Sequence, residues 1–286
     1  MDFLFTSILD GLMLGFVYGL AAMGLTLIWG VMNVINLSHG PIISLGMFGV
    51  YLLFTFLGLN PYLALIFVAI FGLLLGIVIY FVAVNRVIDA PHLSTLLATF
   101  AVAMIITGLG TAVFTASPRN VDYSLGSVTL GSATIPVTRI VAAVLSILIT
   151  AGLYLYLQRT RSGRYIRAVA NNRSAAELMG VPSVRILALS FGIGTMLAAL
   201  AGGLISTLFP FTILAGGTYE LKSFVIGVLG GLGNPIGALF GGLILGVLEG
   251  IIPTFMPATW VPVLEFVLFV LILLVRPQGL FGAKKS

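Results

Sequence analysis

Long apolar runs, broken by short polar interruptions, organise the chain from one end to the other. The runs lie near residues 3–31, 36–57, 61–84, 95–115, 137–157, 186–209 and 261–275. Several of them exceed the roughly 18 apolar residues that mark a membrane helix. They lack the two-residue alternation of a membrane β-barrel strand. The pattern therefore predicts an all-α integral membrane protein that crosses the bilayer several times.

The composition supports this interpretation. Of the 286 residues, 60% are hydrophobic and only 7% are charged, whereas soluble domains carry about 25% charged residues. Too few polar side chains are present to cover a surface that faces water. The sequence shows no clear internal repeat and no low-complexity linker, so residues 1–286 are expected to form one transmembrane domain. The absence of cysteine excludes disulfides and thiolate metal sites.

One polar segment, residues 158–185, stands between two of the apolar runs. It holds six of the thirteen basic residues of the chain and a single acid, Glu177. The basic residues are Arg159, Arg161, Arg164, Arg167, Arg173 and Arg185. Because short cytoplasmic loops are enriched in Lys and Arg, we expect this segment to be a cytoplasmic loop.

Counting spans outward from that loop predicts the topology. Residues 117–136 become an external loop, and their Thr, Ser, Val and Gly content suggests a small extended excursion. The N-terminus is then external. The C-terminal tail, with Arg276, Lys284 and Lys285, is then cytoplasmic.

This topology requires the Gly-rich residues 220–250 to enter the membrane and return. About 30 residues are too few for two ordinary spans of about 20 each. The sequence Gly233-Asn234-Pro235 interrupts any helix in the middle of the stretch. We therefore expect two short half-helices that fold back as a re-entrant hairpin, and about eight transmembrane segments in total.

A short helix is expected inside the polar segment. Ser174 and Glu177 have the spacing of a capping box, in which a serine opens a helix and a glutamate reaches back to it. Gly180 and Pro182 are helix-stop signals. The predicted helix, residues 174–179, is either a solvated connector or a docking helix that presents Ala, Leu and Met to a groove of a partner.

Four sequence stretches carry a resemblance to a known family. They are RAVANNRSAAELMGV at residues 167–181, GLTLIWGV followed by VINLSHG within residues 24–40, VLGGLGNP with Gly237-Ala238 within residues 228–238, and RPQGLFG at residues 276–282. In this order they resemble the high-affinity branched-chain amino-acid permeases of ATP-binding-cassette importers. The match extends along the chain.

The resemblance implies a permease subunit in a bacterial inner membrane, with several partners. These are two cytoplasmic ATPases, a periplasmic substrate-binding protein and a second related permease, more often different than identical. The coupling contact with the ATPases would be Ser174, Ala175, Ala176, Glu177, Leu178, Met179 and Gly180. The residues themselves agree that the chain is not the ATPase, since no G-x-x-x-x-G-K-[ST] phosphate loop occurs. Branched-chain or related small amino acids are the implied substrates, with urea, short amides or other amino acids as alternatives.

Five polar residues are candidates for the translocation path, namely Asn33, Asn36, His39, Asn234 and Glu249. Four of them have a second explanation: helix capping and interhelical hydrogen bonding for the first three, and snorkelling or pairing with Lys222 for Glu249. Buried polar groups in a membrane are costly and often functional, which keeps the path hypothesis open.

Other chemistry has little support in the sequence. Ser38 and His39 are adjacent and so point in different directions on a helix, and His39 and His92 lack the spacing of a metal motif. We expect no catalytic residue, metal or cofactor. A secondary transporter would need an ion-coupling relay, which the sparse acids do not form, and an intramembrane enzyme would need a buried nucleophile with its base.

Overall fold

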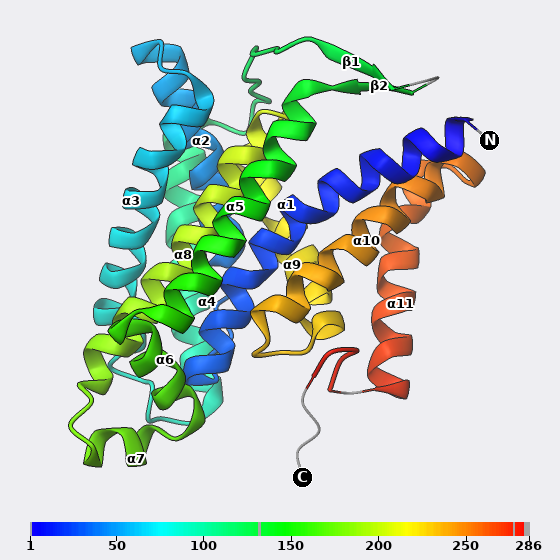
Figure 1. Ribbon diagram of the computed structural model, residues 1–286. Coiled ribbons are helices and arrows are strands. Elements are labelled where there is room, and N and C mark those ends of the chain that lie inside the picture. The colour runs from blue at the N-terminus through cyan, green and yellow to red at the C-terminus, as the bar shows by residue number, and fades with distance from the viewer. Residues whose placement is uncertain (1, 131–132, 277, 283–286) are drawn as a thin grey trace.

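The computed structural model describes residues 2–130, 133–276 and 278–282, in which long helices run between two ends of the molecule (Figure 1). The long helices are α1 (Asp2–Met32), α2 (His39–Leu57), α3 (Pro61–Ile79), α4 (His92–Phe114), α5 (Val137–Arg159), α8 (Ser183–Ser206), α9 (Gly216–Gly230), α10 (Pro235–Phe255) and α11 (Val261–Val275). The short elements are η1 (Tyr80–Val84), β1 (Ser127–Leu130), β2 (Ala133–Pro136), α6 (Arg161–Asn171), α7 (Arg173–Leu178), η2 (Ile213–Ala215) and η3 (Ala258–Trp260).

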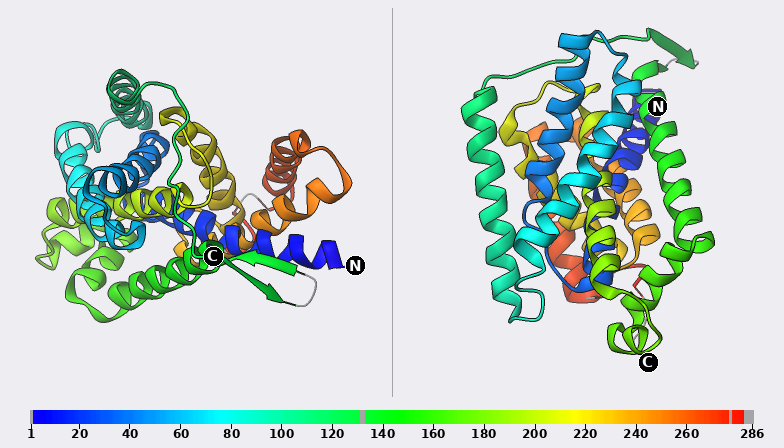
Figure 2. Two further views of the ribbon diagram at one scale, coloured as in Figure 1. Left: turned by 90° about the horizontal axis from the view of Figure 1, so that it is seen from above. Right: turned by 90° about the vertical axis from the view of Figure 1, so that its left-hand side faces the viewer.

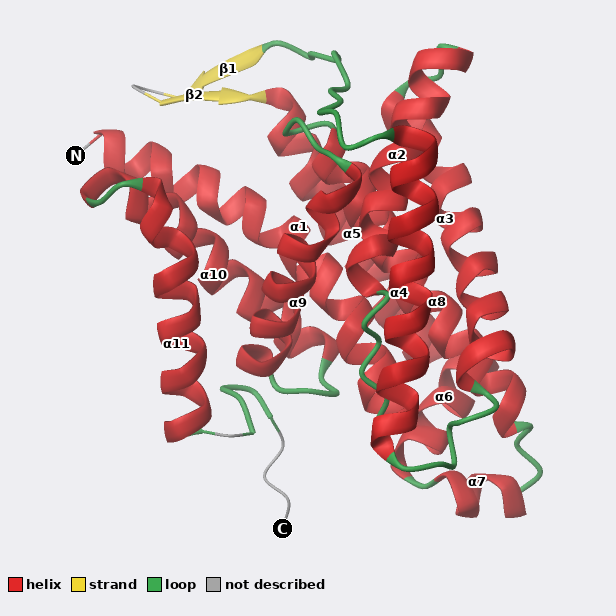
Figure 3. Cartoon of the chain, turned by 180° about the vertical axis from the view of Figure 1, so that it is seen from behind, coloured by secondary structure: helices red, strands yellow, loops and turns green. Residues whose placement is uncertain are grey.

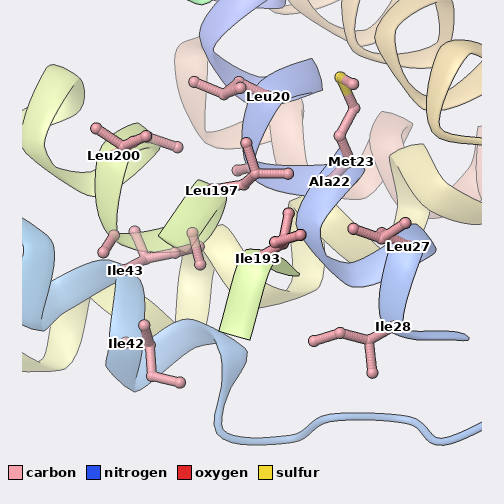
Figure 4. Packing of buried hydrophobic residues seen from close by; sticks show 14 of the residues in the cluster. Leu20, Ala22, Met23, Leu27, Ile28, Ile42, Ile43, Ile193, Leu197 and Leu200 are labelled. Atoms are coloured by element: carbon pink, nitrogen blue, oxygen red, sulfur yellow. The ribbon is translucent and has the colours of Figure 1, made fainter. Parts of the chain in front are cut away.

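Helices α1 and α8 form the centre of the bundle, since 83% and 78% of their most apolar stretches are buried. Their side chains meet those of α2 in the core (Figure 4). The contributors that Figure 4 labels include Leu20, Met23, Leu27, Ile28, Ile42, Ile43, Ile193 and Leu197. Lipid tails are as apolar as these side chains, so close packing rather than exclusion from water holds such helices together.

Glycines bring α1 and α10 into direct backbone contact. This glycine seam consists of Gly11, Gly15 and Gly19 on α1 and Gly242, Gly246 and Gly250 on α10. A Cβ atom at Gly15 would lie only 2.7 Å from the carbonyl oxygen of Gly242. Four-residue spacing of small residues allows this close approach between membrane helices. Much of the glycine on these two helices therefore serves packing.

Helices α9 and α10 confirm the predicted break but not the predicted lengths. Gly231 and Gly233 have φ of +92° and +89°, a conformation that favours glycine, and they form the turn between the two helices. The two helices extend beyond the expected residues 220–250, since α9 begins at Gly216 and α10 ends at Phe255. Lys222 and Glu249 lie inside these helices and pair with each other. The described residues contain nine helices long and apolar enough to span a membrane, which agrees roughly with the expected eight, and α10, with 21 residues, is longer than the expected half-helix.

The loops separate into two groups, as the counted topology requires. The β-hairpin of β1 and β2, which pairs Ser127 with Pro136, lies at the same end as the start of α1, and we call this the hairpin end (Figure 1). Helices α6 and α7 and the last described residues lie at the opposite end, the α7 end (Figures 1 and 2). The extended excursion predicted within residues 117–136 is thus present. Lys284 and Lys285 lie outside the described residues.

Candidate functional site

The polar segment folds into two consecutive short helices at the α7 end. Thr160 opens α6 by accepting a hydrogen bond from the Gly163 amide at 2.9 Å. Asn172 opens α7 in the same way, because its Oδ1 accepts from the Ala175 amide at 2.9 Å. The prediction that Ser174 caps this helix was wrong: asparagine caps helices as well as serine does, and the helix begins one residue earlier than expected.

Glu177 does not take part in capping; its carboxylate connects α7 to the start of α8. Its Oε1 accepts hydrogen bonds from the Ser183 hydroxyl at the start of α8 and from Arg173 Nε at 3.1 Å. Arg173 also pairs with Asp89 at 2.9 Å, which ties α7 to the loop after α3. The Ser183 and Arg173 hydrogen bonds lower the pKa of Glu177, so the carboxylate stays charged at neutral pH. Both ends of α7 are therefore held in place.

The tip of α7 carries two apolar side chains that contact almost nothing. Leu178 and Met179 are 89% and 84% exposed, whereas Ala176 on the opposite face is buried. Gly180, with φ of +80°, then turns the chain sharply towards α8. Helix α7 lies beyond the ends of the spans at the α7 end of the bundle (Figure 1). An exposed apolar tip on a rigidly held helix is suited to insertion into a groove of another protein.

A charged cluster joins four helices within the spans. Lys222 of α9 lies 2.5 Å from Glu249 of α10 and 3.6 Å from Glu265 of α11. The hydroxyl of Tyr18 on α1 donates to Glu249 at 3.3 Å, and the Lys222 ammonium lies 4.8 Å from the centre of the Tyr18 ring. The pairing of Glu249 with Lys222 that the sequence suggested as the simpler explanation is present.

The other path candidates lie in two separate places. Asn36 and His39 are buried where α1 meets α2: Asn36 Oδ1 accepts from the Ser38 hydroxyl at 2.6 Å, and His39 Nε2 donates to the Ala21 carbonyl at 3.0 Å. Asn33, with φ of +53°, is exposed in the loop between these helices.

Asn234 and Glu249 are not neighbours, because they lie at opposite ends of α10. Asn234 caps that helix by accepting from the Gly237 amide at 3.1 Å, and it donates to the Phe281 carbonyl at 3.0 Å. It also lines a cavity of about 240 Å³ between α1, α5 and α6, together with Arg167. The structure thus groups Asn33, Asn36 and His39 but does not bring all five candidates to one site.

Glu220 is a polar residue that the sequence reasoning did not single out. It lies in the first turns of α9 and lines a cavity of about 330 Å³ between α2, α4 and η2. The sequence pattern puts Glu220 at the first position of the Gly-rich residues 220–250. Its place inside a stretch long enough to cross the membrane was the available signal, because acids within such stretches are often functional.

The spans, the Arg-rich end and the exposed tip of α7 define a multi-spanning membrane permease. The chain belongs to the family described as branched-chain amino acid transport system / permease component, whose model matches residues 7–275. It is 29% identical to the high-affinity branched-chain amino acid transport system permease protein LivH of Salmonella typhimurium, over 96% of this chain and 94% of LivH. It is also 29% identical to the corresponding protein BraD of Pseudomonas aeruginosa, over 96% and 95%.

A solved structure shares the fold. PsaBC from Streptococcus pneumoniae in complex with Fab matches with a TM-score of 0.53 over 94% of this chain and 91% of that chain. Because the two sequences are only 14% identical, this likeness concerns the arrangement of helices alone.

Proposed function

We propose that the chain is one permease subunit of an ATP-binding-cassette importer for branched-chain or related small amino acids. The observation that carries the proposal is α7, a short helix fixed at both ends whose Leu178 and Met179 stand free at the Arg-rich end. Two cytoplasmic ATPases would bind Ser174–Gly180 and drive the permease through it. The names of the 29% identical relatives support the substrate class.

The proposed orientation places the α7 end in the cytoplasm and the hairpin end outside a bacterial inner membrane. Arg159, Arg161, Arg164, Arg167 and Arg185 gather at the α7 end, and basic loop residues favour the cytoplasmic side. The N-terminus is then external, and a periplasmic binding protein would deliver substrate to the hairpin end. No phosphate-binding loop sequence occurs in the chain, so the energy comes from the ATPases.

A second permease is proposed to cover the face on which α9 is recessed. On this face α4 and α11 stand on either side of α9 (Figure 3), and only 17% of the most apolar stretch of each is buried within this subunit. Pairing of two related permeases would create the translocation path between them. Asn33, Asn36, His39, Asn234 and Glu249 remain candidates for polar groups near this path.

Reconstitution with candidate ATPases, a second permease and a binding protein tests the proposal. ATP hydrolysis and uptake would be measured with leucine, valine, polar amino acids and urea. We expect leucine or valine to stimulate both activities. Stimulation by urea or a polar amino acid instead would replace the substrate class, and uptake independent of ATPases would show a secondary transporter.

A further inference from the structure

Glu220 differs from the other acids in the spans because its charge is not balanced. It forms no hydrogen bond or ion pair with any residue that the structure describes. Lys222 lies two positions away, points in another direction around α9, and is already engaged by Glu249 and Glu265. An uncompensated carboxylate inside a membrane protein is costly in free energy, and it is a suitable partner for a cationic group.

The backbone around Glu220 leaves room for its carboxylate. A Cβ atom at Gly40, in the first turn of α2, would lie 2.7 Å from Glu220 Oε2. Gly216 at the start of α9 packs against the same turn, and its amide donates to the Ser44 hydroxyl at 2.8 Å. The side chain of Glu220 is thus placed between two helix starts that could not approach as closely with larger residues.

The cavity beside Glu220 is otherwise mainly apolar. Phe100, Met104 and Leu214 line it, and Thr107 adds a hydroxyl. The three apolar side chains are half exposed in this subunit, so the cavity opens outward. Its volume of about 330 Å³ falls at the lower end of small-molecule sites, which begin near about 300 Å³.

The depth of the cavity is that of a transport site. Phe100, Met104 and Thr107 come from the middle of α4, and α9 begins beside them rather than at the hairpin end of the bundle (Figures 2 and 3). Transporters place substrate sites near the middle of the bilayer, beside helices that begin or break there. The cavity lies beside the start of α9, on the face proposed above for the path.

We propose that Glu220 binds the ammonium group of the transported amino acid in this cavity. The aliphatic side chain of the substrate would then contact Phe100, Met104 and Leu214. This inference rests on the proposed function, and it adds a substrate site within the path. A carboxylate beside an apolar wall matches an ammonium group attached to a branched hydrocarbon, the two features that branched-chain amino acids combine.

The chain contains no cysteine, which permits a direct test in the assembled transporter. Thr107→Cys places one thiol in the cavity, and Ser117→Cys places a control thiol in the external loop. Maleimide labelling of this subunit is followed with leucine, with isopentylamine, which lacks the carboxylate, and with 4-methylpentanoate, which lacks the ammonium group.

Leucine and isopentylamine should slow labelling of Thr107→Cys, by about tenfold at ten times the dissociation constant, whereas 4-methylpentanoate should not. Labelling of Ser117→Cys should not change with any ligand. Glu220→Gln should weaken leucine protection by about ten- to hundredfold, because a hydrogen bond to a charged group is lost. Glu220→Asp, which keeps the charge, should restore part of the protection.

Three results would overturn the inference: equal protection by 4-methylpentanoate and leucine, full protection in Glu220→Gln, or no protection in a transporter that imports leucine. If Glu220→Gln prevents assembly while Glu220→Asp assembles without any leucine protection, the carboxylate holds a cation of the second permease instead. Failure of the unmodified transporter to import any amino acid would reject the proposed function rather than the site alone.

Discussion

Leu178 provides the sharpest test of coupling, because its side chain is 89% exposed in the free subunit. If the ATPase buries it fully, Leu178→Ala removes three carbon groups from the contact, each worth about 0.8 kcal/mol. The sum is about 2.4 kcal/mol, which corresponds to about 60-fold weaker binding of the ATPase. Little change in folding is expected, since the side chain contacts almost nothing within this subunit.

The assay is the affinity of purified ATPase for permease in detergent or nanodiscs, measured together with substrate-stimulated ATP hydrolysis. Leu57→Ala is the matched control, because Leu57 is 68% exposed but lies at the hairpin end of α2. The control should bind the ATPase normally. Unchanged affinity and stimulation in Leu178→Ala would refute the assignment of α7 as the coupling contact.

Three further predictions follow from local geometry. Gly180→Val should raise the conformational free energy of the loop by about 1–2 kcal/mol, because φ at this position is +80°. The change should misplace α7 and uncouple ATP hydrolysis from uptake. In the control Gly108→Val, whose new side chain enters open space, hydrolysis and uptake should stay coupled. Lys222→Met should lower the free energy of unfolding of the purified subunit by about 3–5 kcal/mol, because it leaves buried carboxylates unpaired. Adding Glu249→Gln should recover part of this loss. No recovery would contradict the ion-pair explanation. Gly15→Val should separate α1 from α10 and reduce the yield of folded protein, and a normal melting temperature would show that the seam tolerates side chains.

Much of the fold could be predicted because membrane insertion leaves a strong trace in the sequence. Continuous apolar runs predicted the spans, and Arg-rich residues 158–185 predicted which loops lie together. The lengths of α9 and α10 could not be obtained in the same way. The expected stretch was limited to residues 220–250, whereas the pairing of Lys222 with Glu249 allows charged residues to lie within longer helices.

The candidate site shows a similar division between local and distant information. Residues 174–179 were predicted to form a short helix that presents Ala, Leu and Met. The helix is present, but its cap is Asn172 rather than Ser174 and its first residue is Arg173, since Asn and Ser are both suitable capping residues. The contact of Glu177 with Ser183 and that of Arg173 with Asp89 depend on segments brought together by folding. No periodic pattern in the sequence reports such contacts.

The glycine seam has a mechanical consequence for transport. Its glycines recur every four residues on both helices, so the next register that again opposes glycine to glycine requires a shift of about 6 Å along the axis. Any smaller displacement would drive a larger side chain into a facing backbone. Helices α1 and α10 therefore cannot slide past each other by small steps, and they must move together as a rigid pair. Small motions during transport are then left to α4 and α11, whose described residues make no glycine contact of this kind with a facing backbone.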